Sequence, residues 1–148
     1  MYLRISLDSY LELEKIAEKV FYPLKGFMTE KDFISVLKEM RLSNGKLFPI
    51  PVLLPISIKD KEEVEVNKKI FLKYKNNIVG EIIVKSIFTI NFKKFIKELF
   101  GTQDTNHPGY KNLIKNGKHF IGGPINLTKK INYKYSNYSL SPSVVKKI

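Results

Sequence analysis

Apolar residues recur at helical spacing in two stretches near the start of the chain. The first stretch predicts a helix over residues 8–20, with Asp8 or Ser9 as its N-cap. The second predicted helix begins at Thr29, whose hydroxyl should cap the first turn in a shortened capping box with Asp32. The buried face of this second helix is expected to consist of Phe33, Val36, Leu37 and Met40.

Alternating apolar and polar residues predict strands in the middle of the chain. Residues 70–74 and 78–87 flank a pair of asparagines and are typical of a β-hairpin. Residues 48–58 form an extended segment, and Pro51 and Pro55 place it at a sheet edge or in a bulge because proline cannot donate to a central ladder.

Helical spacing returns over residues 92–100, which predict a short amphipathic helix ended by Gly101 as a C-cap. Residues 102–109 then have the composition of an ordered functional loop. One more helical turn is predicted over residues 110–115.

Residues 59–69 are rich in charge and predict a solvated loop. Two closing strands are expected at residues 119–121 and 125–135, joined by a turn at Gly122-Gly-Pro124. Short strands and helices alternate without a βαβ rhythm, so we predict an α+β fold with a small mixed barrel.

Composition indicates one folded domain over residues 1–148, with 43% apolar and 12% aromatic residues. The chain has no cysteine, which excludes disulfides, thiolate metal sites and cysteine nucleophiles and fits a reducing cytoplasm. The longest apolar stretch, residues 50–58, is too short to span a bilayer. We therefore expect a cytoplasmic protein with no membrane partner.

The formal net charge is +12 and the calculated pI is about 9.7. Such a field attracts phosphate polyanions, but only Arg4 and Arg41 supply the guanidinium groups that read phosphates and bases bidentately. Both a nucleic-acid footprint and a solubility effect remain open. Lysines clustered beside Lys111, Lys115 and Lys118 would favour RNA, and an even spread would not.

Two blocks of motifs carry a family resemblance. The first block contains Tyr22-Pro-Leu-Lys-Gly-Phe-Met28, Met40-Arg-Leu-Ser-Asn-Gly45 and Phe48-Pro-Ile-Pro-Val52. The second contains Phe100-Gly-Thr-Gln-Asp104, His107-Pro-Gly109 and Gly122-Gly-Pro124. From about residue 11 to about residue 146 the chain resembles the N-terminal PUA-like domain of ATP sulfurylase (sulfate adenylyltransferase). One departure is Phe48, which stands where the family usually has tryptophan.

The resemblance implies a PUA-like small mixed β-barrel with short flanking helices. In the family, the enzyme joins ATP and sulfate to give adenosine 5′-phosphosulfate and pyrophosphate, a step of sulfate assimilation. Residues 140–145 look like the segment that leads into the catalytic nucleotidylyltransferase domain, which we expect to be absent here. That domain's Gln-x-Arg-Asn and His-x-x-His signatures cannot be built from Gln103, His107 and His119, the only glutamine and histidines.

The chain alone is therefore expected to be noncatalytic and to pack against a catalytic domain, in cis in the full-length family or in trans here. No catalytic residue, cofactor or metal is assigned, since Glu62, Glu63 and Glu65 cluster in a lysine-rich stretch without histidine. The alternative function is a freestanding PUA-like module that binds RNA or a nucleotide.

Six residues are candidates for a ligand or interdomain contact: Arg41, Thr102, Asp104, Asn106, His107 and Lys118. His107 could act as a general base, or its imidazole could bond to the backbone of a rigid His-Pro-Gly turn. Asp104 could act as an acid or base, or could cap the amides that follow it. Arg41 could contact a neighbouring domain or phosphate, or form a salt bridge with Asp32 or Glu39.

Overall fold

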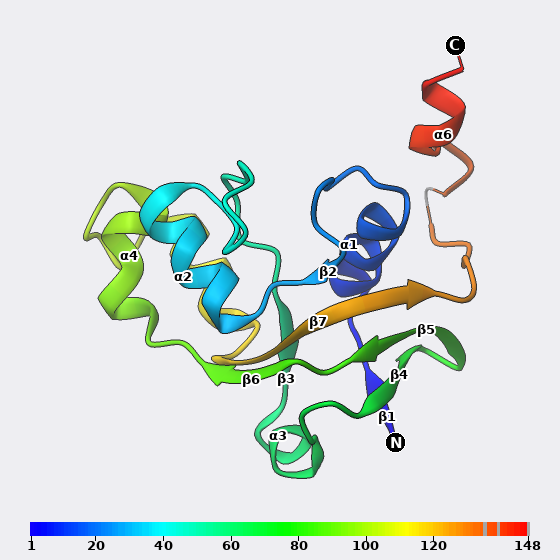
Figure 1. The fold of residues 1–148 in the computed structure, drawn as a ribbon, viewed down its shortest axis with the longest axis horizontal. Helices are drawn as coiled ribbons and strands as arrows, with labels where there is room; N and C mark the ends of the chain where they lie inside the picture. Colours follow the sequence, from blue (N-terminus) through cyan, green and yellow to red (C-terminus); the bar gives the residue numbers. More distant parts are fainter. Residues whose placement is uncertain (135, 139, 148) are drawn as a thin grey trace.

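A curled mixed sheet flanked by short helices forms the protein in a computed structural model, which describes residues 1–134, 136–138 and 140–147 (Figure 1). Its strands are β1 (Tyr2–Arg4), β2 (Gly26–Phe27), β3 (Leu54–Ile56), β4 (Lys69–Tyr74), β5 (Asn77–Ile83), β6 (Ser86–Thr89) and β7 (His119–Leu127). Its helices are α1 (Leu7–Ala17), α2 (Glu30–Glu39), α3 (Ile58–Glu63), α4 (Phe92–Phe100), α5 (Pro108–Lys115) and α6 (Pro142–Val145), with a 3-10 turn at Ser136–Tyr138.

Strand β7 is the centre of the sheet. Its first half pairs antiparallel with β3 and β6, with Ile121 opposite both Leu54 and Ile87. Its second half pairs antiparallel with β2 and β5, where Pro124 lies opposite Gly26. The outer hairpin of β4 and β5 extends the sheet to β1, which runs parallel to β4. The mixed, curled sheet with short helices confirms the predicted α+β fold class.

Gly122 and Gly123 lie inside β7 at the point where two other backbone segments approach it. A Cβ atom at Gly122 would lie 2.0 Å from the carbonyl oxygen of Met28, and one at Gly123 would lie 2.0 Å from that of Ile83. Only glycine leaves room for such contacts. The predicted turn at Gly122-Gly-Pro124 is therefore wrong, because these glycines serve close packing of distant backbones instead.

The strand consequently runs unbroken from His119 to Leu127. The separate strand predicted over residues 125–135 is wrong in its extent, since pairing stops at Leu127, and its last residue, Tyr135, lies outside the described residues.

Two hydrophobic clusters lie on opposite sides of β7. The larger cluster packs α1 against β1, β4 and β5, with the side chains of Tyr10, Leu13 and Leu72 fully buried. The smaller cluster joins α2, β6, α4 and α5 and contains Phe33, Phe88, Ile90, Phe92, Ile96, Tyr110 and Phe120. Because successive strand side chains point to opposite faces, Phe120 enters the smaller cluster and Ile121 the larger one.

Side-chain caps set where the first two helices begin. Ser6, not Asp8 or Ser9, caps α1, since its Oγ accepts from the Ser9 amide at 3.1 Å. The Ser6 position was missed because it falls in an alternating strand-like stretch. Thr29 caps α2 as predicted, with its Oγ1 accepting from the Asp32 amide at 3.2 Å.

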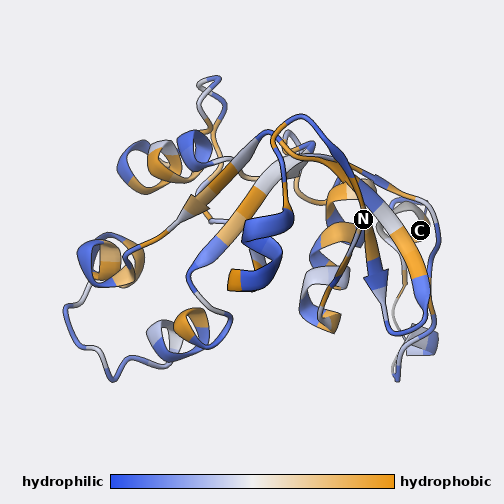
Figure 2. Cartoon of the chain, turned by 90° about the horizontal axis from the view of Figure 1, so that it is seen from below, coloured by the Kyte–Doolittle hydropathy of each residue, from blue (hydrophilic) through white to orange (hydrophobic). Residues whose placement is uncertain are grey.

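Two further features differ from prediction. Met40 is 62% exposed rather than buried, because it is the left-handed C-cap of α2 with φ 53°. The stretch predicted as a loop over residues 59–69 contains α3, which Ser57 caps by accepting from the Asp60 amide at 3.0 Å. Helix α3 has no buried residue and is mostly hydrophilic in Figure 2, so the sequence has no apolar periodicity there that would predict a helix.

Other elements match their predictions. The β4–β5 hairpin is confirmed, although the second predicted strand divides into β5 and β6. Helix α4 spans the predicted residues and ends at Gly101 with φ 67°. Pro55 lies in β3, an edge strand that pairs only with β7 among the described strands.

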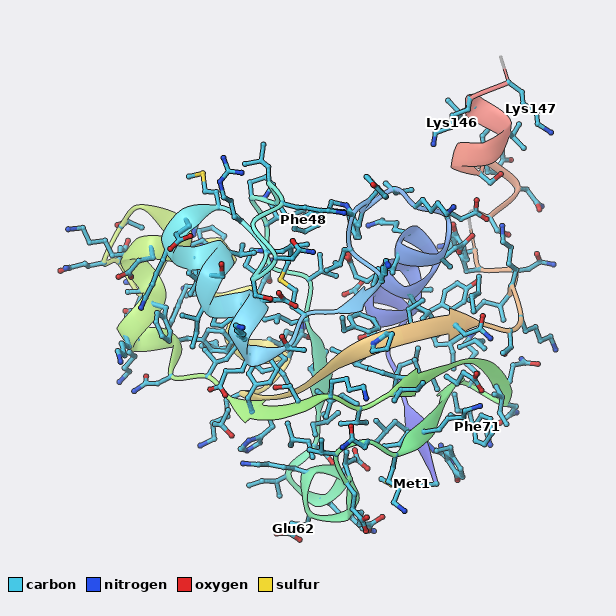
Figure 3. The ribbon with its side chains drawn as sticks, viewed as in Figure 1. Met1, Phe48, Glu62, Phe71, Lys146 and Lys147 are labelled. Atoms are coloured by element: carbon cyan, nitrogen blue, oxygen red, sulfur yellow. The ribbon has the colours of Figure 1, made fainter. Side chains whose placement is uncertain are left out.

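After β7 the chain passes over α1. The Ile131 amide donates to the Tyr10 hydroxyl at 3.0 Å, and Lys130 forms an ion pair with Glu18. Helix α6 then stands away from the sheet, with Lys146 and Lys147 at its far end (Figure 3). No helix in the described ranges is long and apolar enough to cross a membrane.

Candidate functional site

The loop between α4 and α5 is ordered by its own polar side chains. Thr102 Oγ1 accepts from the Asp104 amide at 3.2 Å, and Asp104 Oδ1 accepts from the Asn106 amide at 2.8 Å. The His107 amide donates to the Asp104 carbonyl at 3.1 Å. Each side chain therefore satisfies an amide two residues on, as Asx and ST turns do.

His107 joins this loop to α5. Its Nδ1 accepts from the Gly109 amide at 3.1 Å, so the imidazole caps the helix. The ring also stacks on Phe100, with ring centroids 5.0 Å apart. The bond to backbone expected for a rigid His-Pro-Gly turn is present, and it occupies the nitrogen that a general base would use.

Arg41 braces the turn that follows α2. Its guanidinium donates to the Gly45 carbonyl at 3.0 Å, and Arg41 pairs with Leu47 in an isolated antiparallel bridge. Within the described part of the chain it forms no ion pair, so the salt bridge considered with Asp32 or Glu39 is not formed. Asp32 instead accepts from the amide and hydroxyl of Ser43.

Lys118 lies at the other end of α5 from the 102–107 loop. It precedes His119, whose Nδ1 lies 2.8 Å from Thr89 Oγ1, which also accepts from Lys61 Nζ at 2.9 Å. Burial lowers the pKa of His119, and the charges of Lys61 and Lys118 lower it further. The structure thus brings together Thr102, Asp104, Asn106 and His107 but leaves Arg41 and Lys118 on other segments.

An exposed apolar surface, missed from the sequence, lies over two neighbouring loops. We call it the loop surface; it consists of Val20, Tyr22, Met40, Leu47 and Ile50, each between 48% and 71% exposed. The loops touch, since Lys46 Nζ lies 5.7 Å from the Tyr22 ring centroid and Phe21 packs edge-on against Phe48. The sequence signal that could have indicated this surface is the presence of large apolar side chains in segments without helical or strand periodicity.

Comparison with known proteins gives the family. A family model described as a PUA-like domain matches residues 1–130. The chain belongs to the PUA-like domain family. The sulfate adenylyltransferase of Pyrococcus abyssi is 36% identical over 143 residues, which cover 95% of this chain and 37% of the relative. That of Thermococcus onnurineus is 36% identical over 140 residues, covering 95% of this chain and 36% of the relative.

This PUA-like domain therefore spans about a third of the length of the curated relatives it matches. Among solved structures, a hexameric APS kinase from Thiobacillus denitrificans superposes on 99% of this chain and 25% of its own, with a TM-score of 0.72. At 12% identity this likeness concerns the fold alone. The predicted family resemblance is confirmed over nearly the whole chain.

Proposed function

We propose that this PUA-like domain serves a sulfate adenylyltransferase as its N-terminal, noncatalytic domain. The reaction is the conversion of ATP and sulfate to adenosine 5′-phosphosulfate and pyrophosphate, on a catalytic domain that packs against this one in cis or in trans. The observation that carries the proposal is the similarity to sulfate adenylyltransferases over 95% of this chain but only about 37% of theirs. The absence of cysteine is compatible with work in the cytoplasm.

The loop surface is the part of the domain that we assign to this packing. It gathers large apolar side chains that a free domain would leave in water, and such patches mark interaction surfaces. Arg41 pairs with Leu47, a residue of the loop surface, which supports Arg41 as a contact to the catalytic domain in this proposal. Val20 and Leu140 line one cavity, so the loop surface adjoins residues 140–145, the segment that we expect to lead into the catalytic domain.

The test measures sulfate-dependent pyrophosphate release from ATP. The purified chain should be silent alone and should bind and activate the catalytic domain of the Pyrococcus abyssi relative expressed without its own PUA-like region. Leu47→Ser with Tyr22→Ser should weaken binding about tenfold or more, because truncating a central apolar anchor costs over 1 kcal/mol. Turnover by the chain alone would overturn the proposal.

Ile58→Ser is the matched control for this variant. Ile58 is 63% exposed, against 64% for Leu47, and it lies on α3. Figure 3 shows Glu62 of α3 far from Phe48, which follows Leu47 of the loop surface in the sequence. Binding should stay within about twofold of the parent chain, and equal losses in both variants would remove the loop surface from the proposal.

A second candidate function is binding of single-stranded RNA, and the outer face of the β1–β4–β5 sheet favours it. Tyr2 and Phe71 are paired across β1 and β4 and are 49% and 42% exposed. Lys73 Nζ lies 4.8 Å from the Tyr2 ring centroid, and Arg4 pairs with Lys73. Aromatic platforms beside basic side chains stack bases and neutralise phosphates. This face, rather than the neighbourhood of Lys118, would carry the RNA.

The RNA test is a titration of a labelled twelve-nucleotide oligouridylate at two salt concentrations. Phe71→Ala and Tyr2→Ala should each lower affinity about tenfold, while Tyr22→Ala, an exposed aromatic in the loop surface, should not. Binding that ignores these substitutions, or that does not weaken with salt, would reject this candidate.

A further inference from the structure

A cavity of about 630 Å³ opens where the end of β6, the start of α4, helix α5 and the residues just before β7 meet, beside the smaller hydrophobic cluster. Its lining consists of Thr89, Ile90, Asn91, Phe92, Lys93, Tyr110, Ile114, Gly117 and Lys118. The volume falls within the range of roughly 300–1,000 Å³ that small-molecule sites occupy. Lys118, one of the six candidate contact residues, lines this cavity, and neither the domain packing nor the RNA binding proposed above uses the cavity.

The N-terminus of α4 opens into the cavity without a side-chain cap. Asn91 stands at the N-cap position and makes no capping bond. The amides of Phe92 and Lys93, both cavity residues, donate to no other described residue. Such free amides at the positive end of a helix dipole attract anions.

Tyr110 gives an independent indication of a ligand. Its side chain is only 6% exposed, yet its hydroxyl has no hydrogen-bond partner among the described residues. The hydroxyl is not fully enclosed by protein, and Tyr110 lines the cavity. A tyrosine buried to this degree usually pairs its hydroxyl, so this one is available to a bound molecule.

The charges and the apolar lining define what would fit. Lys93 and Lys118 supply two positive charges, and the lining contains no aspartate or glutamate. Ile90 and Phe92 form a buried apolar floor, and Ile114 is 45% exposed at the same cavity. An anionic head group and an apolar body are therefore both accommodated.

We propose that this cavity binds a small organic phosphate or sulfate ester. The α4 amides, Lys93 and Lys118 hold the anionic group, the Tyr110 hydroxyl donates to it or to its ester oxygen, and Ile114 covers a flat apolar body. This site belongs to the described chain itself and does not depend on the presence of a catalytic domain or on its reaction.

The test uses phenyl phosphate as the probe in an amide NMR titration of the complete chain. Saturable binding with a dissociation constant on the order of 1 mM is expected for a ligand of this size. The largest shifts should fall on the amides of Phe92, Lys93 and Lys118. Phenyl sulfate in a parallel titration identifies which of the two anionic groups the site prefers.

Variants locate the binding. Lys118→Gln and Lys93→Gln should each weaken it about tenfold, because each removes a charge-assisted hydrogen bond. Tyr110→Phe should weaken it roughly threefold to tenfold while leaving the melting temperature unchanged, since the lost hydroxyl bonds to none of the residues that the structure describes. Lys97→Gln is the matched control, because Lys97 is in α4 but does not line the cavity.

Several results would overturn the proposal. One is a titration with phenyl phosphate in which the amide shifts do not saturate. Another is binding of inorganic phosphate or phenol as tight as that of phenyl phosphate. Equal losses in Lys97→Gln and Lys118→Gln would mean attraction to net charge only. A Tyr110→Phe chain that melts earlier than the parent would show that the hydroxyl is used inside the fold.

Discussion

Alanine at Gly122 should destabilise the domain far more than alanine at another glycine. The added Cβ would lie 2.0 Å from the Met28 carbonyl oxygen, whereas real Cβ contacts stay beyond 3.0 Å. The two backbones must separate by roughly 1 Å, which disturbs two hydrogen bonds, from the Met28 amide to Val52 and from the Lys85 amide to Gly122. At about 1 kcal/mol for each bond and about 1–3 kcal/mol for overpacking, the loss is about 3–5 kcal/mol.

Gly45→Ala is the matched control, since a Cβ there meets no atom within 4 Å and faces only the strain of φ +84°. That strain costs about 1 kcal/mol. Urea unfolding followed by tyrosine fluorescence and far-UV circular dichroism gives both values, because the chain has eight tyrosines and no tryptophan. A Gly122→Ala chain within 1 kcal/mol of Gly45→Ala would refute the reasoning.

Three further perturbations test particular contacts. Tyr10→Phe leaves the Ile131 amide unpaired and should cost about 1 kcal/mol in urea unfolding, with faster hydrogen exchange at that amide; unchanged exchange would contradict this. Asp32→Ala removes the acceptor for Ser43 and should cost about 1–2 kcal/mol by the same assay, whereas a neutral result would mean that the turn is held otherwise. Folding lowers the pKa of His119 below its ordinary value of 6.5. As the pH falls, His119 therefore takes up a proton in the unfolded chain before it does in the folded chain, and the free energy of unfolding should decrease below about pH 6.5. His119→Gln should flatten this pH dependence, and an unchanged slope would assign it to other groups.

Local signals were sufficient for elements whose causes lie within a few residues. Thr29 and Asp32 stand three positions apart, and the Thr29 hydroxyl accepts from the Asp32 amide as the spacing predicts. The Asp32 carboxylate accepts from the Thr29 hydroxyl rather than from the Thr29 amide that a capping box would use. The loop of Thr102, Asp104 and His107 is similarly self-contained, because each side chain reaches an amide two residues on. Such contacts depend little on the rest of the fold.

Contacts between distant segments explain the failures. Gly-Gly-Pro is typical of a turn, but the neighbours that require Gly122 and Gly123 are Met28 and Ile83, which no local pattern connects to them. The cavity next to α4 was missed for the same reason. Tyr110 counted as part of one helical turn, and only the packed fold shows that it is 6% exposed and lines a cavity.

The position of β7 in the sequence has a consequence for the order in which the chain can fold. Every strand that pairs with β7 precedes it, so a ribosome releases β2, β3, β5 and β6 before their shared partner exists. Until residues 119–127 emerge, the edges of these strands stay open and Phe120 and Ile121 are missing from their clusters. Formation of the native sheet must wait until residues 119–127 have been synthesised, and nascent chains stopped before residue 119 should be vulnerable to aggregation and proteolysis.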